Sequence, residues 1–193
     1  PAHRLDKDTS GVLLLAKNEE TLKFLQKQFQ ERKVEKKYIA LVVGHLKIDR
    51  GKIETLIGRS PGDRRKQKVY LPGEPGLEKS RRKAITKYRV LQRLSAQGGS
   101  ASGGENYDLI EAEPQTGRKH QIRTHLAYLG HPVAGDKLYG FKNQPYPKGL
   151  KRQFLHSNYL KIGLPNGEIK EFKSILPKDL ELCLQNLKLL SRA

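Results

Sequence analysis

Residues 3–18 read HRLDKDTSGVLLLAKN, and the expected fold is built outward from this stretch. Residues 3–11 are mostly polar, whereas residues 12–16 form a continuous apolar run of strand length. A run of this kind suits a strand that is buried on both faces of a sheet. We therefore predict a core strand over residues 12–16, with Asp6 on the loop that enters it.

The segments that follow predict a helix and a second strand. Asn18 can cap a helix, because its side-chain oxygen can accept a hydrogen bond from a backbone amide of the first turn. Apolar residues then recur at helical spacing from Leu22 to Phe29, which predicts a helix that ends near Arg32. Residues 38–43, YIALVV, are rich in β-branched side chains and predict a strand.

The middle of the chain is basic at first and then alternates like a strand. Residues 58–83 predict a basic loop, which is either a solvated surface excursion or an element that follows phosphates. Residues 84–94 alternate between two faces and predict a half-exposed strand, and residues 107–112 predict another. Residues 95–105 are dominated by Gly and Ser, which predicts a flexible loop within one domain.

The last third completes an α+β domain. We predict a helix over residues 118–129, capped by Gly130, and a hairpin of strands 154–164 and 168–175 around an Asn-Gly turn. A terminal helix begins at Pro177. Its predicted buried stripe consists of Leu180, Leu184, Leu187 and Leu190. The whole pattern predicts a mixed, mostly antiparallel sheet flanked by helices.

The composition points to a nucleic-acid partner. The chain has 193 residues, with 38 Lys and Arg against 20 Asp and Glu, so its formal net charge is +18. Such a charge favours association with phosphate groups, although a merely basic or ribosome-adhering protein would share it. The single cysteine, Cys183, excludes an intramolecular disulfide, and no apolar run reaches the roughly eighteen residues of a membrane span. We expect a cytoplasmic protein.

A second polar segment, residues 116–125, adjoins the predicted helix over residues 118–129. Lys119 and His120 precede Arg123 by four and three residues, so on a helix they would share a face suited to a carboxylate or a phosphate. Ile122 would point toward the core.

The spacing of the polar residues argues against a metal site. His120 and His125 are five residues apart, which points them to different faces of a helix, and no HExxH pair is present. Asp6 and Asp8 could form a paired-carboxylate metal site, but neighbouring basic side chains already supply countercharge. Spacing alone predicts a polar site of open chemistry.

Four segments resemble one known family. Residues 3–18, residues 36–44 (KKYIALVVG) and residues 116–140 (TGRKHQIRTHLAYLGHPVAGDKLYG) resemble, in order, the three motifs of the RluA-type pseudouridine synthases. Residues 154–167 (FLHSNYLKIGLPNG) resemble the close of the family's catalytic domain. The resemblance implies that residues 1–193 form a pseudouridine synthase catalytic domain. Members normally have earlier strands, and the chain lacks methionine altogether, so we expect an N-terminally truncated domain.

The resemblance also implies roles for individual residues. Asp6 matches the essential aspartate that helps to break the glycosidic bond, so that uracil can re-attach through C5. Tyr38 would stack on the flipped base and assist proton transfer, and Arg123 would pair with Asp6. Arg4 would enter the RNA stack as the target uridine is flipped out. The remaining matches, as supports or RNA contacts, are Lys37, Arg118, His120 and Gln121.

Each of these roles has a structural alternative. Asp6 could be only a turn aspartate, and Tyr38 only a sheet residue. Arg4 and Arg123 could be surface phosphate binders. For His120 and for His125, structural hydrogen bonding is the preferred interpretation.

The implied function is an RNA pseudouridine synthase, an isomerase that uses no metal and no organic cofactor. Large-subunit ribosomal RNA is the expected substrate and transfer RNA the second candidate. We expect a monomer that has no membrane partner. A catalytically silent RNA-binding or ribosome-assembly protein stays open as an alternative. A nuclease would need metal ligands that the motifs lack.

Overall fold

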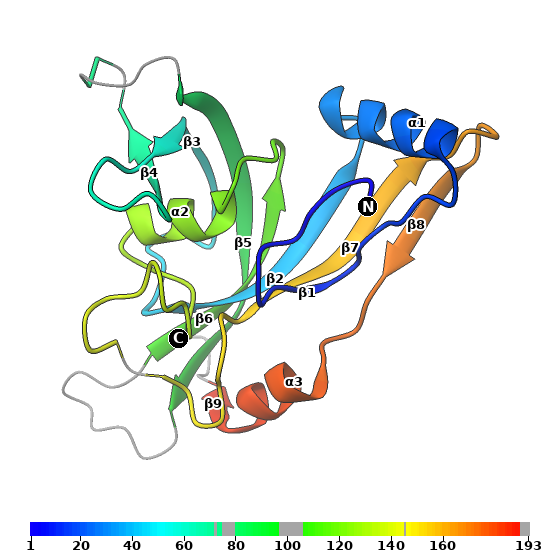
Figure 1. Ribbon diagram of the computed structural model, residues 1–193. Helices are drawn as coiled ribbons and strands as arrows, with labels where there is room; N and C mark the ends of the chain where they lie inside the picture. Colours follow the sequence, from blue (N-terminus) through cyan, green and yellow to red (C-terminus); the bar gives the residue numbers. More distant parts are fainter. Residues whose placement is uncertain (72, 75–79, 97–105, 145, 190–193) are drawn as a thin grey trace.

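The computed structural model describes residues 1–71, 73–74, 80–96, 106–144 and 146–189, which form a mixed sheet with three helices (Figure 1). The elements are β1 (Ser10–Gly11), α1 (Glu19–Gln30), β2 (Glu35–Val43), β3 (Arg50–Arg59), β4 (Gln67–Tyr70), β5 (Arg82–Ala96), β6 (Asn106–Pro114), α2 (Gln121–Tyr128), β7 (Leu155–Gly163), β8 (Ile169–Lys173), α3 (Lys178–Gln185) and β9 (Leu187–Leu189).

The sheet has the order β1-β7-β2-β6-β5-β3-β4, with β8 added to β7 and β9 added to β5. Among the described strands, β1 with β7 is the one parallel pairing, and all other pairings are antiparallel. The predicted α+β class with a mostly antiparallel sheet is confirmed.

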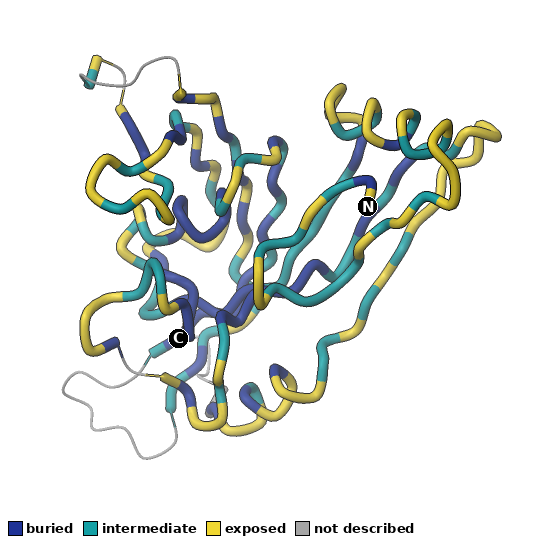
Figure 2. Tube along the Cα trace, in the orientation of Figure 1, coloured by how far each residue is buried: buried dark blue, intermediate teal, exposed yellow. Residues whose placement is uncertain are grey.

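The helices cover both faces of the sheet. Successive residues of a strand point to opposite faces. Ala40 and Val42 of β2 belong to a core cluster with α2, whereas Leu41 between them belongs to a cluster with α3. Helix α1 packs on Leu160 and Ile162 of β7 in a third cluster. The central strands are mostly buried, while α1 exposes its outer side (Figure 2).

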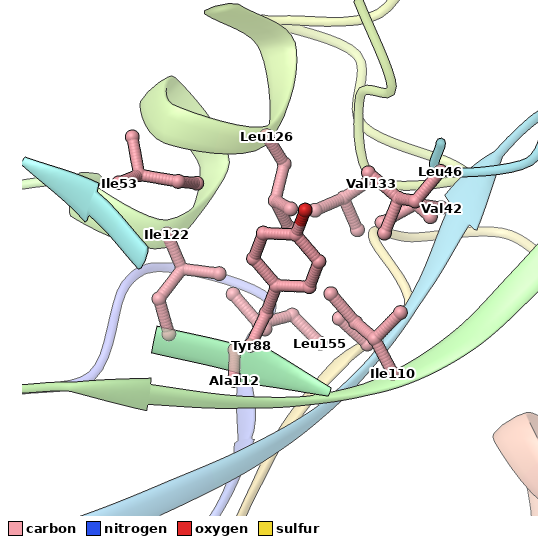
Figure 3. Close-up of a cluster of buried hydrophobic side chains, with 11 residues drawn as sticks. Val42, Leu46, Ile53, Tyr88, Ile110, Ala112, Ile122, Leu126, Val133 and Leu155 are labelled. Atoms are coloured by element: carbon pink, nitrogen blue, oxygen red, sulfur yellow. The ribbon is translucent and has the colours of Figure 1, made fainter. Parts of the chain in front are cut away.

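Tyr88 lies at the centre of the core beneath α2. Ile122 and Leu126 point from the helix toward its ring, with Val42 beyond it (Figure 3). A Cβ on Gly51 of β3 would lie 2.5 Å from this ring. The ring of Tyr88 therefore fills space that only a glycine at position 51 leaves open. Ile122 belongs to the same core cluster, so its predicted core position is confirmed.

The prediction of a core strand over residues 12–16 is wrong. Regular pairing is confined to Ser10 and Gly11, and the following residues run as an irregular extended segment. Leu13 and Leu15 are 45% and 70% exposed, while Val12 and its alternate neighbours pack inward. The apolar run is long enough for a strand, but it lies beside only one neighbour and one core cluster.

The helix after this segment is confirmed. Asn18 accepts a hydrogen bond of 2.8 Å from the amide of Thr21, as the cap predicts. The helix ends at Gln30, and Arg32 adopts a left-handed φ of 59° that turns the chain toward β2. Strand β2 itself begins three residues before the predicted Tyr38.

The predicted basic loop over residues 58–83 is wrong in part. This range contains the end of β3, the whole of β4 and the start of β5, and β3 was not predicted at all. Ile57 and Val69 are neighbours across β3 and β4, and both are buried in a small cluster with Ala84. Their burial stabilises a hairpin whose many charges otherwise suggest a loop.

Two helix boundaries also differ from the prediction. Helix α2 begins at Gln121 instead of residue 118, because His120 has a left-handed φ of 54°. Helix α3 ends at Gln185, and Leu187 lies in β9, which pairs with β5. The apolar stripe is therefore shared between a helix and a strand, and Leu190 lies outside the described residues.

The other predicted elements are confirmed. The strands around residues 84–94 and 107–112 are β5 and β6, and β7 and β8 form the predicted hairpin. Of the predicted loop over residues 95–105, Ser95 and Ala96 belong to β5, and residues 97–105 lie outside the described part. No helix among the described residues is long and apolar enough to cross a membrane.

Candidate active site

A pocket of about 700 Å³ opens on the face of β2 that carries α1 and α2. Its walls are the N-terminal segment, the second half of α1, the start of β2 and the loop that leads into α2. In Figure 1 the dark blue N-terminal segment runs between α1 and α2. The first and third motifs, which are distant in sequence, therefore meet at one cavity.

Asp6 lies on a loop that the residues before β7 hold in place. The side-chain amide of Gln153 donates to the carbonyl of Lys7 at 2.8 Å and to the hydroxyl of Thr9 at 3.0 Å. The guanidinium of Arg152 donates to the carbonyl of Asp8 at 2.9 Å. These bonds fix the backbone on the C-terminal side of Asp6, so its carboxylate reaches the pocket from a restrained loop.

Arg123 lies between two carboxylates in the first turn of α2. Its Nε and Nη2 donate to Asp136 at 2.6 and 2.9 Å, and its Nη1 lies 3.5 Å from Oδ2 of Asp6. Burial opposes the charge of Arg123, but Asp136 and then Asp6 outweigh it and raise the pKa of the guanidinium. Arg123 therefore stays charged, is held firmly by Asp136, and presents one nitrogen to Asp6.

Asp136 and Tyr139 were not predicted as site residues, although both lie inside residues 116–140, which resemble the third motif. Asp136 is buried and also accepts from the amides of Leu138 and Tyr139. The hydroxyl of Tyr139 lies 2.8 Å from Nδ1 of His120 and accepts from the amide of Gln67 at 2.7 Å. Tyr139 thus connects the β3–β4 hairpin to the site.

Tyr38 reaches the same pocket from β2. Burial, together with the negative charge of Asp6, raises the pKa of the Tyr38 phenol. The hydroxyl therefore keeps its proton at neutral pH and can donate it. The structure brings Asp6, Tyr38 and Arg123 together, as the resemblance implies.

Lys37 does not reach the pocket. It follows Lys36 by one residue, so its side chain points to the opposite face of β2. There its ammonium lies 3.3 Å from Glu35 and 5.2 Å from the ring centre of Tyr159. Lys36 lines the pocket instead, with its ammonium 3.4 Å from the carbonyl of Thr116, and burial lowers its pKa to about 8. The two-residue period of a strand could have identified Lys36 as the neighbour of Tyr38.

The other predicted residues line the pocket in different ways. Arg4 is exposed at its rim, and Arg118 donates from Nε to the carbonyl of Lys83 at 3.0 Å. His120 also lines it, and burial lowers its pKa. It does so from the turn before α2, so the predicted shared helix face with Lys119 does not exist.

The side chain of Gln121 makes its hydrogen bonds within the protein. Its carboxamide oxygen accepts from the hydroxyl of Thr116 and the amide of Arg118, and its nitrogen donates to the carbonyl of Ile85 and the hydroxyl of Thr86. It holds the loop before α2 against β5.

His125 is a structural residue, as predicted. It is buried, and its two ring nitrogens lie 3.0 and 2.8 Å from the hydroxyls of Thr55 and Thr86. Burial lowers its pKa to about 4. Within the described residues no group of three or more His, Cys, Asp or Glu side chains could hold a metal ion.

Known proteins that are similar to this chain belong to one family. A profile of the RNA pseudouridylate synthase family matches residues 1–128. The chain is 39% identical over 187 residues to an uncharacterized RNA pseudouridine synthase of Chloroflexus aurantiacus, an alignment that covers 96% of the chain and 52% of that protein. It is 40% identical over 185 residues to the ribosomal large subunit pseudouridine synthase D of Borreliella burgdorferi, covering 95% and 51%.

The fold has a solved counterpart. The structure of human RNA pseudouridylate synthase domain containing 1 matches with a TM-score of 0.81 and 31% identity, over all of this chain and 75% of that one. The profile and the solved structure thus indicate the same class of protein. The chain belongs to the RNA pseudouridylate synthase family, and it spans about half the length of the curated relatives it matches.

Proposed function

We propose that the protein converts uridine to pseudouridine in RNA, with large-subunit ribosomal RNA as its substrate. The observation that carries the proposal is the pairing of Asp6 with Arg123 at the wall of a pocket that also contains Tyr38. Several relatives are named ribosomal large subunit pseudouridine synthase D, which favours this substrate over transfer RNA. We further propose that residues 1–193 are the catalytic domain.

The reaction needs no external reactant. The bond between C1′ of ribose and N1 of uracil breaks, the base turns within the pocket, and C1′ bonds to C5. The proton on C5 leaves and N1 gains one, so substrate and product have the same composition. We therefore propose catalysis by side chains alone, without a metal or an organic cofactor.

Asp6 acts at the glycosidic bond in this proposal, and two neighbours prepare it. Arg123 orients the carboxylate, and Asp136 on its other side keeps the guanidinium from turning away. A preorganised charge of this kind needs no rearrangement during the reaction. Tyr38 lies against the detached base and exchanges protons through a hydroxyl that its raised pKa keeps protonated.

Arg4 has the exposure that base flipping requires. It stands at the rim of the pocket, where its side chain can enter the RNA stack while the uridine turns inward. Flipping costs a few kcal/mol of lost stacking, which an inserted side chain partly offsets. The net charge of +18 attracts the RNA backbone. We propose a monomeric enzyme that acts in the cytoplasm on ribosomal RNA.

The test is to incubate the full-length protein with RNA from a strain that lacks its gene and to map pseudouridine. We expect a new site in large-subunit ribosomal RNA, absent with Asp6→Asn. If the new sites lie only in transfer RNA, then transfer RNA is the substrate and the proposal of ribosomal RNA is wrong. No new site at all, or equal activity in D6N, would reject the proposal of a pseudouridine synthase. The alternative would then be a catalytically silent RNA-binding protein.

A further inference from the structure

The pocket extends beyond the residues that the proposed reaction uses. Away from Asp6 it is bounded by the end of α1, the start of β2 and the turn before α2. The cations of this outer part include Arg32, Lys36 and Arg118. At about 700 Å³ the cavity is in the size range of pockets that hold drug-sized ligands, which is more than a single flipped base needs.

The loop before α2 connects the three cations, since Lys36 lies beside Thr116 and Arg118 lies near Arg32. The ammonium of Lys36 is 3.4 Å from the carbonyl of Thr116 and 3.8 Å from the position that a Cβ on Gly117 would take. Arg118 follows directly along the chain. Burial lowers the pKa of Arg118, and the nearby positive charge of Arg32 lowers it further.

Among the described residues, these cations have no carboxylate as a countercharge. In the part of the chain that the structure describes, none of the three cations forms an ion pair, whereas Lys33 lies 2.7 Å from Glu31. Removing an ammonium from water without a countercharge is costly. Lys36 bears this cost and has only a carbonyl oxygen nearby. The outer part of the pocket is therefore suited to an anion.

The neighbouring wall indicates which anion fits. His3 and Phe29 line the same pocket and stack on each other, with ring centres 4.7 Å apart. Burial lowers the pKa of His3 to about 4, so its ring is uncharged at neutral pH. Cations beside aromatic rings are the combination with which proteins hold single-stranded nucleic acid. Guanidinium groups also match the geometry of phosphate oxygens.

We propose that Arg32, Lys36 and Arg118 form a subsite for the backbone phosphate of a nucleotide next to the target uridine. This inference rests on the proposed function, because it takes the target uridine to occupy the part of the pocket around Asp6 and Tyr38. The subsite holds the strand while the base turns, so that C5 returns to the same ribose carbon. Its contribution is to binding and register.

The first experiment measures binding of a single-stranded oligouridylate by the full-length protein over a range of salt concentrations. For single strands the slope of log K against log salt is negative, and each phosphate contact that is lost reduces its magnitude by about 0.7. We expect this decrease for Lys36→Gln and for Arg32→Gln. The control is Lys173→Gln on β8, whose register with Tyr159 and Lys37 places it on the face opposite the pocket.

Equal slopes for the wild type, K36Q and R32Q would overturn the subsite. Arg32 is exposed, so R32Q keeps the measurement decisive even if K36Q does not fold. Asp6→Asn should retain the wild-type slope while forming no pseudouridine. The wild type and the K36Q and R32Q variants could differ in slope as expected while the wild type forms no pseudouridine. That result would reject the proposed function but keep the phosphate subsite.

The second experiment locates the phosphate. RNA that contains the mapped uridine is made with one neutral methylphosphonate linkage at a time. We expect one linkage beside the uridine to weaken wild-type binding about tenfold, and to weaken K36Q no further. K173Q should behave as the wild type. An equal, additive loss in K36Q at every linkage would show that Lys36 contacts no particular phosphate and would overturn the assignment.

Discussion

Lys36 and Lys37 are identical residues, adjacent in the chain, with opposite surroundings. Lys37 points away from the pocket, beside Glu35 and the ring of Tyr159, so its charge is compensated and solvated. Lys36 points into the pocket with Tyr38 and has no carboxylate partner among the described residues. A step of one residue in a strand exchanges the two faces of a sheet. The difference teaches that the strand face, more than the residue type, separates a cation inside the pocket from one at the surface.

The same contrast extends to the ion pairs of the two faces. On the far face, Arg89 of β5 and Glu111 of β6 form an exposed pair at 3.1 Å, and such pairs contribute little to stability. On the pocket face, Arg123 is buried between Asp6 and Asp136. Breaking a buried pair leaves an uncompensated charge, which is far more costly. Substitutions on the two faces should therefore differ strongly.

The largest effect is expected at Asp6. Asp6→Asn should lower the rate of pseudouridine formation by at least about a thousandfold, because the side chain acts at the reacting bond. The rate is measured by tritium release from RNA labelled at C5 of uridine. Glu35→Gln on the far face is the matched loss of a carboxylate and should leave the rate within about twofold. A D6N enzyme with wild-type rate would contradict the site.

Asp136→Asn should be the next most damaging change. It leaves Arg123 buried with only the longer contact to Asp6, so the free energy of unfolding should fall by about 3–5 kcal/mol. Urea denaturation measures the change. Glu111→Gln, which breaks the exposed pair with Arg89, should cost less than about 1 kcal/mol. Similar losses in both variants would remove the contrast between the faces.

Acid should destabilise the protein through His125. Its pKa is lowered to about 4 in the fold from 6.5, so below pH 6.5 the unfolded chain binds a proton that the folded chain does not. The stability that comes from keeping His125 uncharged is fully present above pH 6.5. It decreases by about 1.4 kcal/mol for each pH unit down to about pH 4.

Urea denaturation of the wild type and His125→Gln at several pH values measures how much of the pH dependence of stability is due to His125. The variant should show a shallower dependence of unfolding free energy on pH, whatever its stability at pH 7. An unchanged dependence would show that His125 does not titrate in this range.

The smallest effect separates the two lysines themselves. Lys36→Gln should weaken RNA binding about tenfold, as expected for the loss of one charged hydrogen bond to phosphate. Lys37→Gln should change the affinity less than twofold, because its charge already lies beside Glu35. Fluorescence anisotropy with labelled RNA at one salt concentration suffices. A larger loss in K37Q would restore Lys37 as the RNA contact that the motif resemblance implies.

Local patterns predicted much of the fold. The cap at Asn18, the alternation along β5 and the hairpin of β7 and β8 depend on nearby residues alone, and the structure contains all three. The hairpin of β3 and β4 could not be predicted in this way. It depends on Ile57 and Val69 meeting beside Ala84, a contact between three segments that no local pattern pairs.

The site divides in the same manner. The motifs identified Asp6, Tyr38 and Arg123. Asp6 and Tyr38 line one pocket, and Arg123 contacts Asp6 behind its wall, whereas their catalytic roles stay predictions. Asp136 was overlooked because its importance lies in a bidentate contact with Arg123 that no spacing rule reveals. The start of α2 was misplaced because the side chain of Gln121 binds the preceding turn, which lets His120 adopt a left-handed conformation.

The sequence by itself determined the α+β class and the family, because short-range periodicity and contiguous motifs carry that information. The same motifs predict Asp6 as the catalytic carboxylate. Only the tertiary structure decided which residues build the pocket beside Lys36 and Tyr38, and that Arg123 is shared by two aspartates. The physical reason is that burial and charge compensation depend on which strands and loops become neighbours, and these neighbours come from distant parts of the chain.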